Sequence, residues 1–315
     1  MGRIKFKVAL LWIFFVFVFF ILKNGDPAWL QFNEIETGPK WRSKMQVEQQ
    51  HRRLHTQKAC QLLGNSSKYA SLDEMNSSHL LWLMRRRMMT CINNKVGSTW
   101  WVNLLLQDYF DGEPLLTAYR SPHYIAETVL GLSPTISSFE RPELLKSVRS
   151  VIIVRHPFVR LVSAYRDKIE SCVDKDACYA YKYGFTRQSV PRSFSAFVEF
   201  LIRTIPESGP FRGQLINDID SHWLPYYINC APCDIKYDFI VKMESWQDDV
   251  RFVLENFNFT SFRENERINA SNATHVALEY FKDVEPHLIS SLYSAYFADF
   301  EMFGYSPNGF YNIYK

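Results

Sequence analysis

The 315-residue sequence has almost no excess charge of either sign. Its 36 lysines and arginines nearly balance 33 aspartates and glutamates, which leaves a formal net charge of +3. This balance argues against a nucleic-acid partner, so any anion site has to come from local clusters of basic residues. The sequence also has no internal repeat and no low-complexity segment, and its 47% hydrophobic content suits a folded domain.

Two ligand-binding signatures are also missing. The Walker sequence G-x-x-x-x-G-K-[ST] does not occur, which argues against a nucleotide phosphotransferase. The pair Cys230 and Cys233 has zinc-like spacing, but no second Cys-x-x-Cys and no histidine pair at zinc spacing accompanies it. We therefore expect no resident metal, and we prefer disulfides to half a zinc site or a redox pair at these two cysteines.

The sequence has one long hydrophobic run, Val8 to Leu22, which follows Arg3, Lys5 and Lys7 and ends at Lys23. This pattern predicts a transmembrane signal anchor over 8–22, a cytoplasmic tail over 1–7, and a lumenal position for the rest of the chain. A cleaved signal peptide is the alternative, but no A-x-A cleavage site follows the run. A short, phenylalanine-rich span suits the thin membranes of the early secretory pathway.

Two further features favour an oxidising lumen. The chain has six cysteines, which can form structural disulfides whose pairing the sequence leaves open. Glycosylation sequons occur at Asn65, Asn76, Asn258, Asn269 and Asn272. Residues 23–85 are mostly polar without a sustained apolar period, so we expect a stem there, followed by a catalytic domain over 86–315.

The most informative stretch runs from Met88 to Leu106. An apolar segment, Met88 to Ile92, predicts a strand, and an apolar segment from Trp100 to Leu106 predicts a buried helix. The polar loop between them holds Lys95, Gly97, Ser98 and Thr99. Because the first amides of a helix lack internal partners, this loop can bind a phosphate or sulfate, although an ordinary strand-to-helix turn is equally compatible.

A second strand-loop-helix unit follows. Val151 to Val154 reads as a strand buried on both faces, and Pro157 suits the first turn of a helix. The apolar stripe of that helix consists of Phe158, Leu161, Val162, Tyr165 and Ile169, and its other face carries Arg160, Ser163 and Asp167. Arg155 falls at the carboxyl end of the strand, where open α/β sheets bind ligands. The two units together suit a ligand with two separated anionic groups.

The remaining elements are less informative. We expect a strand within Tyr237–Glu244 and helices over Phe194–Ile205, Trp246–Phe257 and Tyr280–Tyr296, the last interrupted by Pro286.

In this order the segments resemble the Golgi carbohydrate sulfotransferases of the chondroitin 4-O-sulfotransferase type. The resemblance runs from about Arg87 to Tyr305, and three pieces carry it. They are Lys95 to Trp100, Val154 to Arg166, and His222-Trp223 followed by Cys230-Ala-Pro-Cys233 and Tyr237-Asp238.

The resemblance implies an α/β, P-loop-like sulfotransferase fold: a parallel sheet flanked by helices, behind an N-terminal transmembrane helix. It also implies a single-pass type II protein of the Golgi membrane that uses 3′-phosphoadenosine 5′-phosphosulfate (PAPS) and a glycan acceptor, without a metal. The donor's 5′-phosphosulfate is expected at Lys95, Val96, Gly97, Ser98, Thr99 and Trp100, and its 3′-phosphate at Arg155 and Ser163.

The resemblance also suggests the catalytic groups. Lys95 is expected to stabilise the leaving phosphate, and a general base is expected to take the acceptor proton. His123 falls where the family has a histidine after the first helix, so we favour it over His222, which can also be structural or contact sugar. Two departures from relatives, at Trp101-Val102-Asn103 and at His156, change the expected basicity near the donor.

Two alternatives remain at this point. A Golgi glycosyltransferase would bind Mn²⁺ through Asp218-Ile219-Asp220 or Asp174-Lys175-Asp176. A non-catalytic glycan-binding relative would keep the fold without turnover.

Overall fold

The computed structural model describes residues 38–64, 72, 79–109, 131, 133–170, 185, 189–205, 219–259 and 272–311. The expected tail and membrane anchor lie outside these residues, as do His123, Cys172, Cys178 and the sequons at 65, 76 and 269. Among the described helices, none combines the length and apolar character needed to cross a membrane. The chain divides into two units, Met1–Ser43 and Lys44–Lys315, and the second carries the features described below.

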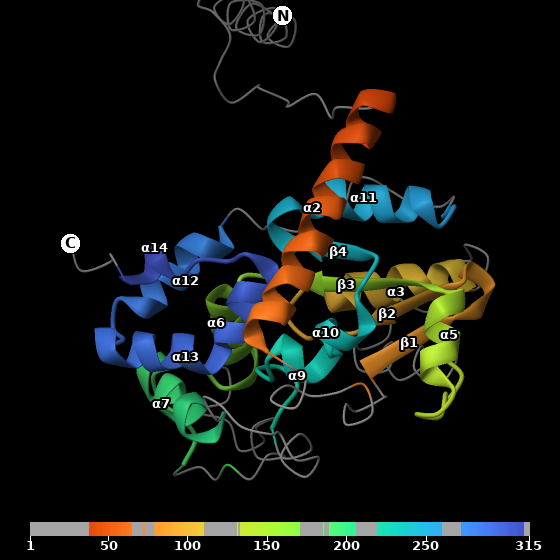
Figure 1. Ribbon diagram of the computed structural model, residues 1–315. Helices are drawn as coiled ribbons and strands as arrows, with labels where there is room; N and C mark the ends of the chain where they lie inside the picture. Colours follow the sequence, from red (N-terminus) through yellow and green to blue (C-terminus); the bar gives the residue numbers. More distant parts are fainter. Residues whose placement is uncertain are drawn as a thin grey trace, which may run out of the picture. The chain divides into compact units, whose positions relative to one another are not determined.

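A four-stranded sheet lies within this second unit (Figure 1). The strands are β1 (Leu80–Leu83), β2 (Met88–Cys91), β3 (Arg149–Val154) and β4 (Phe239–Lys242), in the order β1-β2-β3-β4. The expected parallel sheet is confirmed for β2, β3 and β4, whereas β1 pairs with β2 in antiparallel fashion. The expectation of an entirely parallel sheet is therefore wrong at this edge. The link from β1 to β2 is too short for the crossover that a parallel pair needs.

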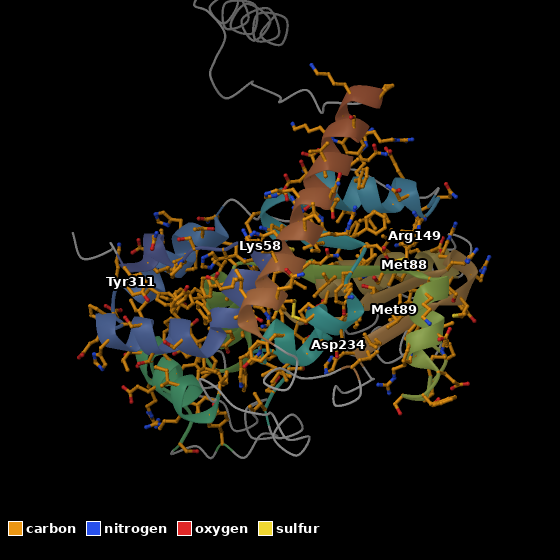
Figure 2. All side chains as sticks on the ribbon, viewed as in Figure 1. Lys58, Met88, Met89, Arg149, Asp234 and Tyr311 are labelled. Carbon is orange, nitrogen blue, oxygen red and sulfur yellow. A yellow bond between two sulfur atoms is a disulfide. The ribbon has the colours of Figure 1, made fainter. Side chains whose placement is uncertain are left out.

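Apolar strand residues fill the centre of this sheet. Met88 and Met89 of β2 are fully buried (Figure 2), and Val151 to Val154 of β3 are at most 2% exposed. This confirms that both segments are strands, and it confirms burial on both faces for Val151 to Val154, which is the usual pattern for parallel strands covered by helices.

Helices surround the sheet (Figure 1). The helices predicted after Lys95, after Arg155 and over Phe194–Ile205 and Trp246–Phe257 are all present. The one expected over Tyr280–Tyr296 is interrupted at Pro286, as predicted, and belongs to two helices. Pro286 occupies the first turn of the second one, where its missing N–H is not needed. The described helices are α2 (Pro39–Leu63), α3 (Ser98–Tyr109), α5 (Arg141–Ser147), α6 (Pro157–Lys168), α7 (Phe194–Thr204), α9 (Tyr226–Cys230), α10 (Pro232–Ile235), α11 (Trp246–Asn256), α12 (Ala273–Phe281), α13 (Pro286–Phe303) and α14 (Asn308–Tyr311). Short 3₁₀ turns occupy Met84–Arg86 and Met243–Ser245.

From Lys44 onward, α2 is bound to strand β4. The side-chain amide of Gln49 accepts from the Ile240 N–H at 2.9 Å and donates to the Ile240 carbonyl at 3.1 Å, as a neighbouring strand would. Arg52 donates to the same carbonyl at 2.8 Å and to the buried carboxylate of Asp249 at 2.6 Å. A segment expected to be stem therefore contributes a helix to the folded body.

Two disulfides add covalent links. Cys60 of α2 is joined to Cys233 of α10, and Cys91 at the end of β2 is joined to Cys230 of α9. Cys230 and Cys233 each pair with a distant cysteine and not with each other, which confirms the structural role and excludes a redox pair between them. Both disulfides close long loops, and such links stabilise a fold chiefly by restricting the unfolded chain.

We predict that Asp249→Ala lowers the free energy of unfolding by about 3–5 kcal/mol, because it leaves the buried guanidinium of Arg52 without its carboxylate. Urea unfolding of the full-length chain measures the loss. Asp283→Ala, which removes an exposed carboxylate, serves as the control and should change stability by no more than about 0.5 kcal/mol. Equal stability of the two variants would show that α2 is not held by this ion pair.

Candidate active site at the carboxyl edge of the sheet

The loop after β2 is fixed at its start by Asn93. This fully buried residue donates from its side-chain nitrogen to the Ile153 carbonyl of β3 at 3.2 Å. Its side-chain oxygen accepts from the amide of Asn229, on α9, at 2.7 Å. The first residues of the loop are therefore tied to both the neighbouring strand and a helix beyond it.

The loop then turns sharply into α3. Lys95 and Gly97 both have left-handed backbones, with φ of 68° and 77°. Glycine adopts this conformation freely, whereas for a lysine it costs roughly 1–2 kcal/mol. The guanidinium of Arg155 donates to the Lys95 carbonyl at 3.2 Å, which helps to hold the strained residue in place.

Helix α3 begins at Ser98, and the Trp101 N–H donates to the Gly97 carbonyl at 3.1 Å. Gly97 therefore occupies the position before the first helical residue. Within the described part of the chain, the hydroxyls of Ser98 and Thr99 have no hydrogen-bond partner. They stay available, beside the first amides of a twelve-residue helix, for an anionic ligand.

The other two residues expected in this loop have different surroundings. Val96 is 1% exposed and anchors the loop in the core. Trp100 lies edge-on to Trp246 of α11, with ring centroids 5.1 Å apart. Val96 therefore offers only its backbone to a ligand, whereas Trp100 is half-buried.

Arg155 lies at the carboxyl end of β3, as predicted. Its backbone N–H donates to the Tyr226 hydroxyl at 3.0 Å, and that hydroxyl donates to the Arg155 carbonyl at 3.1 Å. Because Arg155 also contacts the Lys95 carbonyl, the structure brings the two strand-loop-helix units together, as the sequence suggested. Ser163 lies half-buried on α6, and its hydroxyl has no partner among the described residues.

Arg160 is the main site residue that sequence reasoning misplaced. The sequence put it on the polar face of α6, but its side chain is completely buried. Its guanidinium donates to the carbonyls of Asn94 at 3.0 Å, Leu224 at 2.8 Å and Ser221 at 3.0 Å. Arg160 therefore joins the loop after β2 to the segment that carries His222, and its place opposite the apolar stripe gave no signal of this role.

Positive charge gathers around Lys95. Its ammonium pairs with the Asp167 carboxylate at 3.0 Å, and Lys168 pairs with the same carboxylate at 3.2 Å. Burial lowers the pKa of Lys95 from its ordinary value, Asp167 counteracts the shift, and the nearby charges of Lys168 and Arg155 add to it. An anionic ligand would relieve this repulsion, because it can take over from Asp167 as the partner of the Lys95 ammonium.

His222 forms a buried pair with Asp220. Its ring Nδ1 and its backbone N–H both contact Asp220 Oδ1, at 2.6 and 2.7 Å. Burial lowers the pKa of His222; Asp220 counteracts this shift, and the charges of Lys168 and Lys95 lower the pKa further. Lys95 is therefore close enough to His222 for its charge to affect the protonation of the ring. With Nδ1–H donated to the carboxylate, Nε2 is the nitrogen that can accept a proton.

Sequence reasoning named His222 but missed Asp220 as its partner; the spacing Asp-x-His is the one signal that pointed to it. Asp220 Oδ1 contacts His222, whereas Asp218 lies outside the described residues, so the alternative use of Asp218-Ile219-Asp220 as a metal-binding pair stays a prediction. Within the described ranges, no cluster of three or more histidine, cysteine, aspartate or glutamate side chains is arranged to hold a metal. His123, the other candidate base, lies outside the described residues and stays a prediction.

The two places where the sequence departs from its relatives, Trp101-Val102-Asn103 and His156, add no charge near the donor residues. Trp101 and Val102 are buried in α3, and Asn103 is half-buried. His156 packs edge-on against Phe300, and its Nε2 contacts the Ser306 carbonyl at 3.0 Å. Burial lowers the pKa of His156. A neutral histidine held this way serves the packing of the C-terminal segment and adds no charge to the donor region.

Comparisons with known proteins identify the relatives of this chain. Residues 78–306 match the family described as the sulfotransferase family. The chain belongs to this family. This sulfotransferase is 26% identical over 306 residues to carbohydrate sulfotransferase 8 of Mus musculus, covering 90% of the chain and 69% of the relative.

Two other relatives show similar identity. Carbohydrate sulfotransferase 11 of Mus musculus is 27% identical over 266 residues, covering 77% of the chain and 72% of the relative. Carbohydrate sulfotransferase 10 of Homo sapiens is 27% identical over 245 residues, covering 72% of the chain and 66% of the relative. No solved structure matches the chain. The family resemblance inferred from the sequence motifs is therefore confirmed.

We predict that His222 titrates below its ordinary pKa of about 6.5 and that Asp220→Asn lowers this pKa further. The sign follows because Asp220 favours the protonated ring, so its removal favours the neutral one. Histidine NMR signals followed from pH 4 to 8, with His222→Gln for assignment, measure the shift. Glu285→Gln, beside the exposed His287, is the control and should leave the His222 titration unchanged. A rise in the His222 pKa in Asp220→Asn would contradict the assignment.

Proposed function

We propose that this sulfotransferase transfers the sulfuryl group of PAPS to a hydroxyl of a glycan in the Golgi lumen. The observation that carries the proposal is the contact between Arg155 and the Lys95 carbonyl, which joins two cationic strand ends at one edge of the sheet. PAPS has two separate anionic groups, a 5′-phosphosulfate and a 3′-phosphate. The names of the relatives supply the acceptor class, because each of them is a carbohydrate sulfotransferase.

The donor fits the residues at this edge. The 5′-phosphosulfate would bind at the turn from Lys95 to Trp100, which supplies the first amides of α3, the hydroxyls of Ser98 and Thr99 and the Lys95 ammonium. The 3′-phosphate would bind at Arg155 and Ser163. Arg155 is well suited to a phosphate because its planar guanidinium can donate two parallel hydrogen bonds.

Transfer then follows from charge and position. The acceptor oxygen forms a bond to sulfur while the bond from sulfur to the phosphate oxygen breaks, and the electron pair of that bond stays on the phosphate. Lys95 and the helix amides stabilise the charge that grows there. As in phosphoryl transfer, placing the two reactants in line supplies much of the rate.

The acceptor hydroxyl has to lose its proton. His222 Nε2 is suited to take it, because Asp220 holds the opposite nitrogen and because burial keeps the ring neutral. Removal of either group of this pair should therefore slow transfer more than it weakens donor binding. His123, which lies outside the described residues, stays the base that the family resemblance favours.

The membrane topology and the domain boundaries in this proposal come from the sequence. The proposal includes the cytoplasmic tail over 1–7, the anchor over 8–22, the stem over 23–85 and the catalytic domain over 86–315, with helix α2 of the stem segment packed on the catalytic body. The two disulfides support a lumenal position, because such bonds persist in oxidising compartments.

Calorimetric titration with PAP, the product nucleotide, tests the donor site. We expect saturable binding by the full-length chain, and about ten- to hundredfold weaker binding by Lys95→Ala and by Arg155→Ala, since each removes a charge-assisted contact. Lys282→Ala, which removes an exposed lysine at the end of α12, should bind as the wild type does. Absence of PAP binding by folded wild-type protein would refute the proposal.

Transfer of radioactive sulfate from labelled PAPS to a panel of glycans completes the test. His222→Ala should keep PAP binding and lose about 10²–10⁴-fold in transfer rate. Full transfer by this variant would leave His123 as the base, whereas PAP binding without transfer by the wild type to any glycan would favour the non-catalytic alternative.

A further inference from the structure

A cavity of about 420 Å³ lies against α2, α10 and the start of β4. Its volume falls within the range of about 300–1,000 Å³ that is typical of small-molecule sites. The cavity shares no lining residue with the proposed donor site, since Lys95 to Trp100, Arg155, Ser163 and His222 all lie outside its wall. It is therefore a second hollow in the same folded body, which the donor chemistry does not explain.

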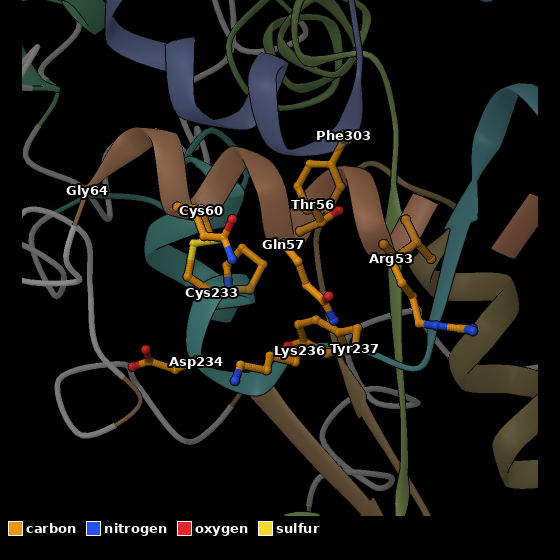
Figure 3. Close-up of a pocket in the computed structure, with 13 residues that line it drawn as sticks. Arg53, Thr56, Gln57, Cys60, Gly64, Cys233, Asp234, Lys236, Tyr237 and Phe303 are labelled. Atoms are coloured by element: carbon orange, nitrogen blue, oxygen red, sulfur yellow. A yellow bond between two sulfur atoms is a disulfide. The ribbon is translucent and has the colours of Figure 1, made fainter. Parts of the chain in front are cut away.

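The wall from α2 presents one face of that helix. Arg53, Gln57 and Gln61 are spaced four residues apart, so their side chains lie one above another along the cavity. Figure 3 shows Gln57 extending from α2 toward Lys236 and Tyr237, with Arg53 on one side and the disulfide Cys60–Cys233 on the other. The disulfide joins the two walls and fixes their separation.

The opposite wall presents Lys236 at the end of α10. Its backbone is left-handed, with φ of 54°, and its N–H donates to the Pro232 carbonyl, which is a common way for a helix to end. The residue itself is exposed. Within the described residues the Lys236 ammonium has no hydrogen-bond or ion-pair partner.

The polar groups of the cavity suit a sugar that carries negative charge. Arg53 and Lys236 supply two cations, and Arg53 uses one N–H to reach the Asp238 carbonyl at 2.9 Å. The carboxylate of Asp234 is engaged by the Leu72 N–H at 2.8 Å, which offsets part of its charge. The amides of Gln57 and Gln61 can both donate and accept, as recognition of sugar hydroxyls requires.

Positive charge continues along α2 beside the cavity. Between Lys44 and Leu63 it carries Lys44, Arg52, Arg53 and Lys58 but only one acidic residue, Glu48. Lys44 and Lys58 are exposed, and Glu48 is paired with Arg52. A polyanionic chain seated in the cavity can therefore continue along α2 without meeting an unpaired carboxylate on this helix.

We propose that the cavity binds an anionic sugar residue of the glycan acceptor, outside the reaction centre. This inference rests on the proposed function and narrows it, because it makes the acceptor an acidic polysaccharide and not a neutral glycan. Contact at a second site along one chain raises the effective concentration of the reacting sugar at the donor site.

Calorimetry with a chondroitin tetrasaccharide, which carries glucuronate carboxylates, tests the inference on the full-length chain with its disulfides intact. Its carboxyl-reduced form has the same length and no charge, and serves as the matched probe. We expect Lys236→Gln and Gln57→Ala each to weaken tetrasaccharide binding at least tenfold, and the reduced form to bind poorly to every variant. Binding at the reaction centre is common to all variants, so the differences among them report the cavity.

Lys282→Gln is the matched control, because it removes the same charge from an exposed position at the end of α12, outside the cavity and away from α2. It should bind the tetrasaccharide like the wild type. PAP binding is measured on every protein and should not change. Failure to bind PAP would refute the proposed function itself. Intact PAP binding with equal tetrasaccharide affinity in all variants, or with equal affinity for the reduced form, would overturn only the cavity assignment.

Discussion

The guanidinium of Arg160 is the interaction on which the proposed active site depends. A buried charge is unfavourable unless hydrogen bonds replace its lost hydration, and Arg160 donates to three backbone carbonyls while it lies 4.5 Å from the centre of the Tyr226 ring. Its carbonyl partners belong to the loop after β2 and to the segment around His222. One side chain of α6 therefore fixes both the loop after β2 and the candidate base His222 relative to the end of β3, which Arg155 follows.

Much of the fold follows from local sequence. The strand and helix around Lys95, and those around Arg155, were predictable because each joins a short apolar run to a helix with a clear start signal. Parallel pairing of β2 with β3 then brings the two strand ends together, so most of the proposed donor site was predictable from the sequence alone. The same reasoning missed β1, because four residues that follow a polar segment give no periodic signal.

The residues whose roles could not be predicted form contacts with partners that are far away in the sequence. Gln49 satisfies the backbone of Ile240, and nothing near Gln49 in the sequence announces this partner. The buried states of Arg160 and Asp220 likewise depend on contacts formed only after the elements pack. The polar composition of this segment suggested a stem, although α2 packs on the folded body there. The reason is that polar side chains and a disulfide hold this helix in place more than an apolar stripe does.

Hydrogen-deuterium exchange of the full-length chain, with and without saturating PAP, tests the central claim most directly, because it locates the bound nucleotide without altering a residue. The account predicts slower exchange in two separate segments, residues 93–100 and residues 155–163, with a smaller effect at 219–225 transmitted through Arg160. Residues 44–63 of α2 should exchange at the same rate in both states. Bound PAP that protects neither the loop after β2 nor the start of α6 would contradict the placement of the donor site.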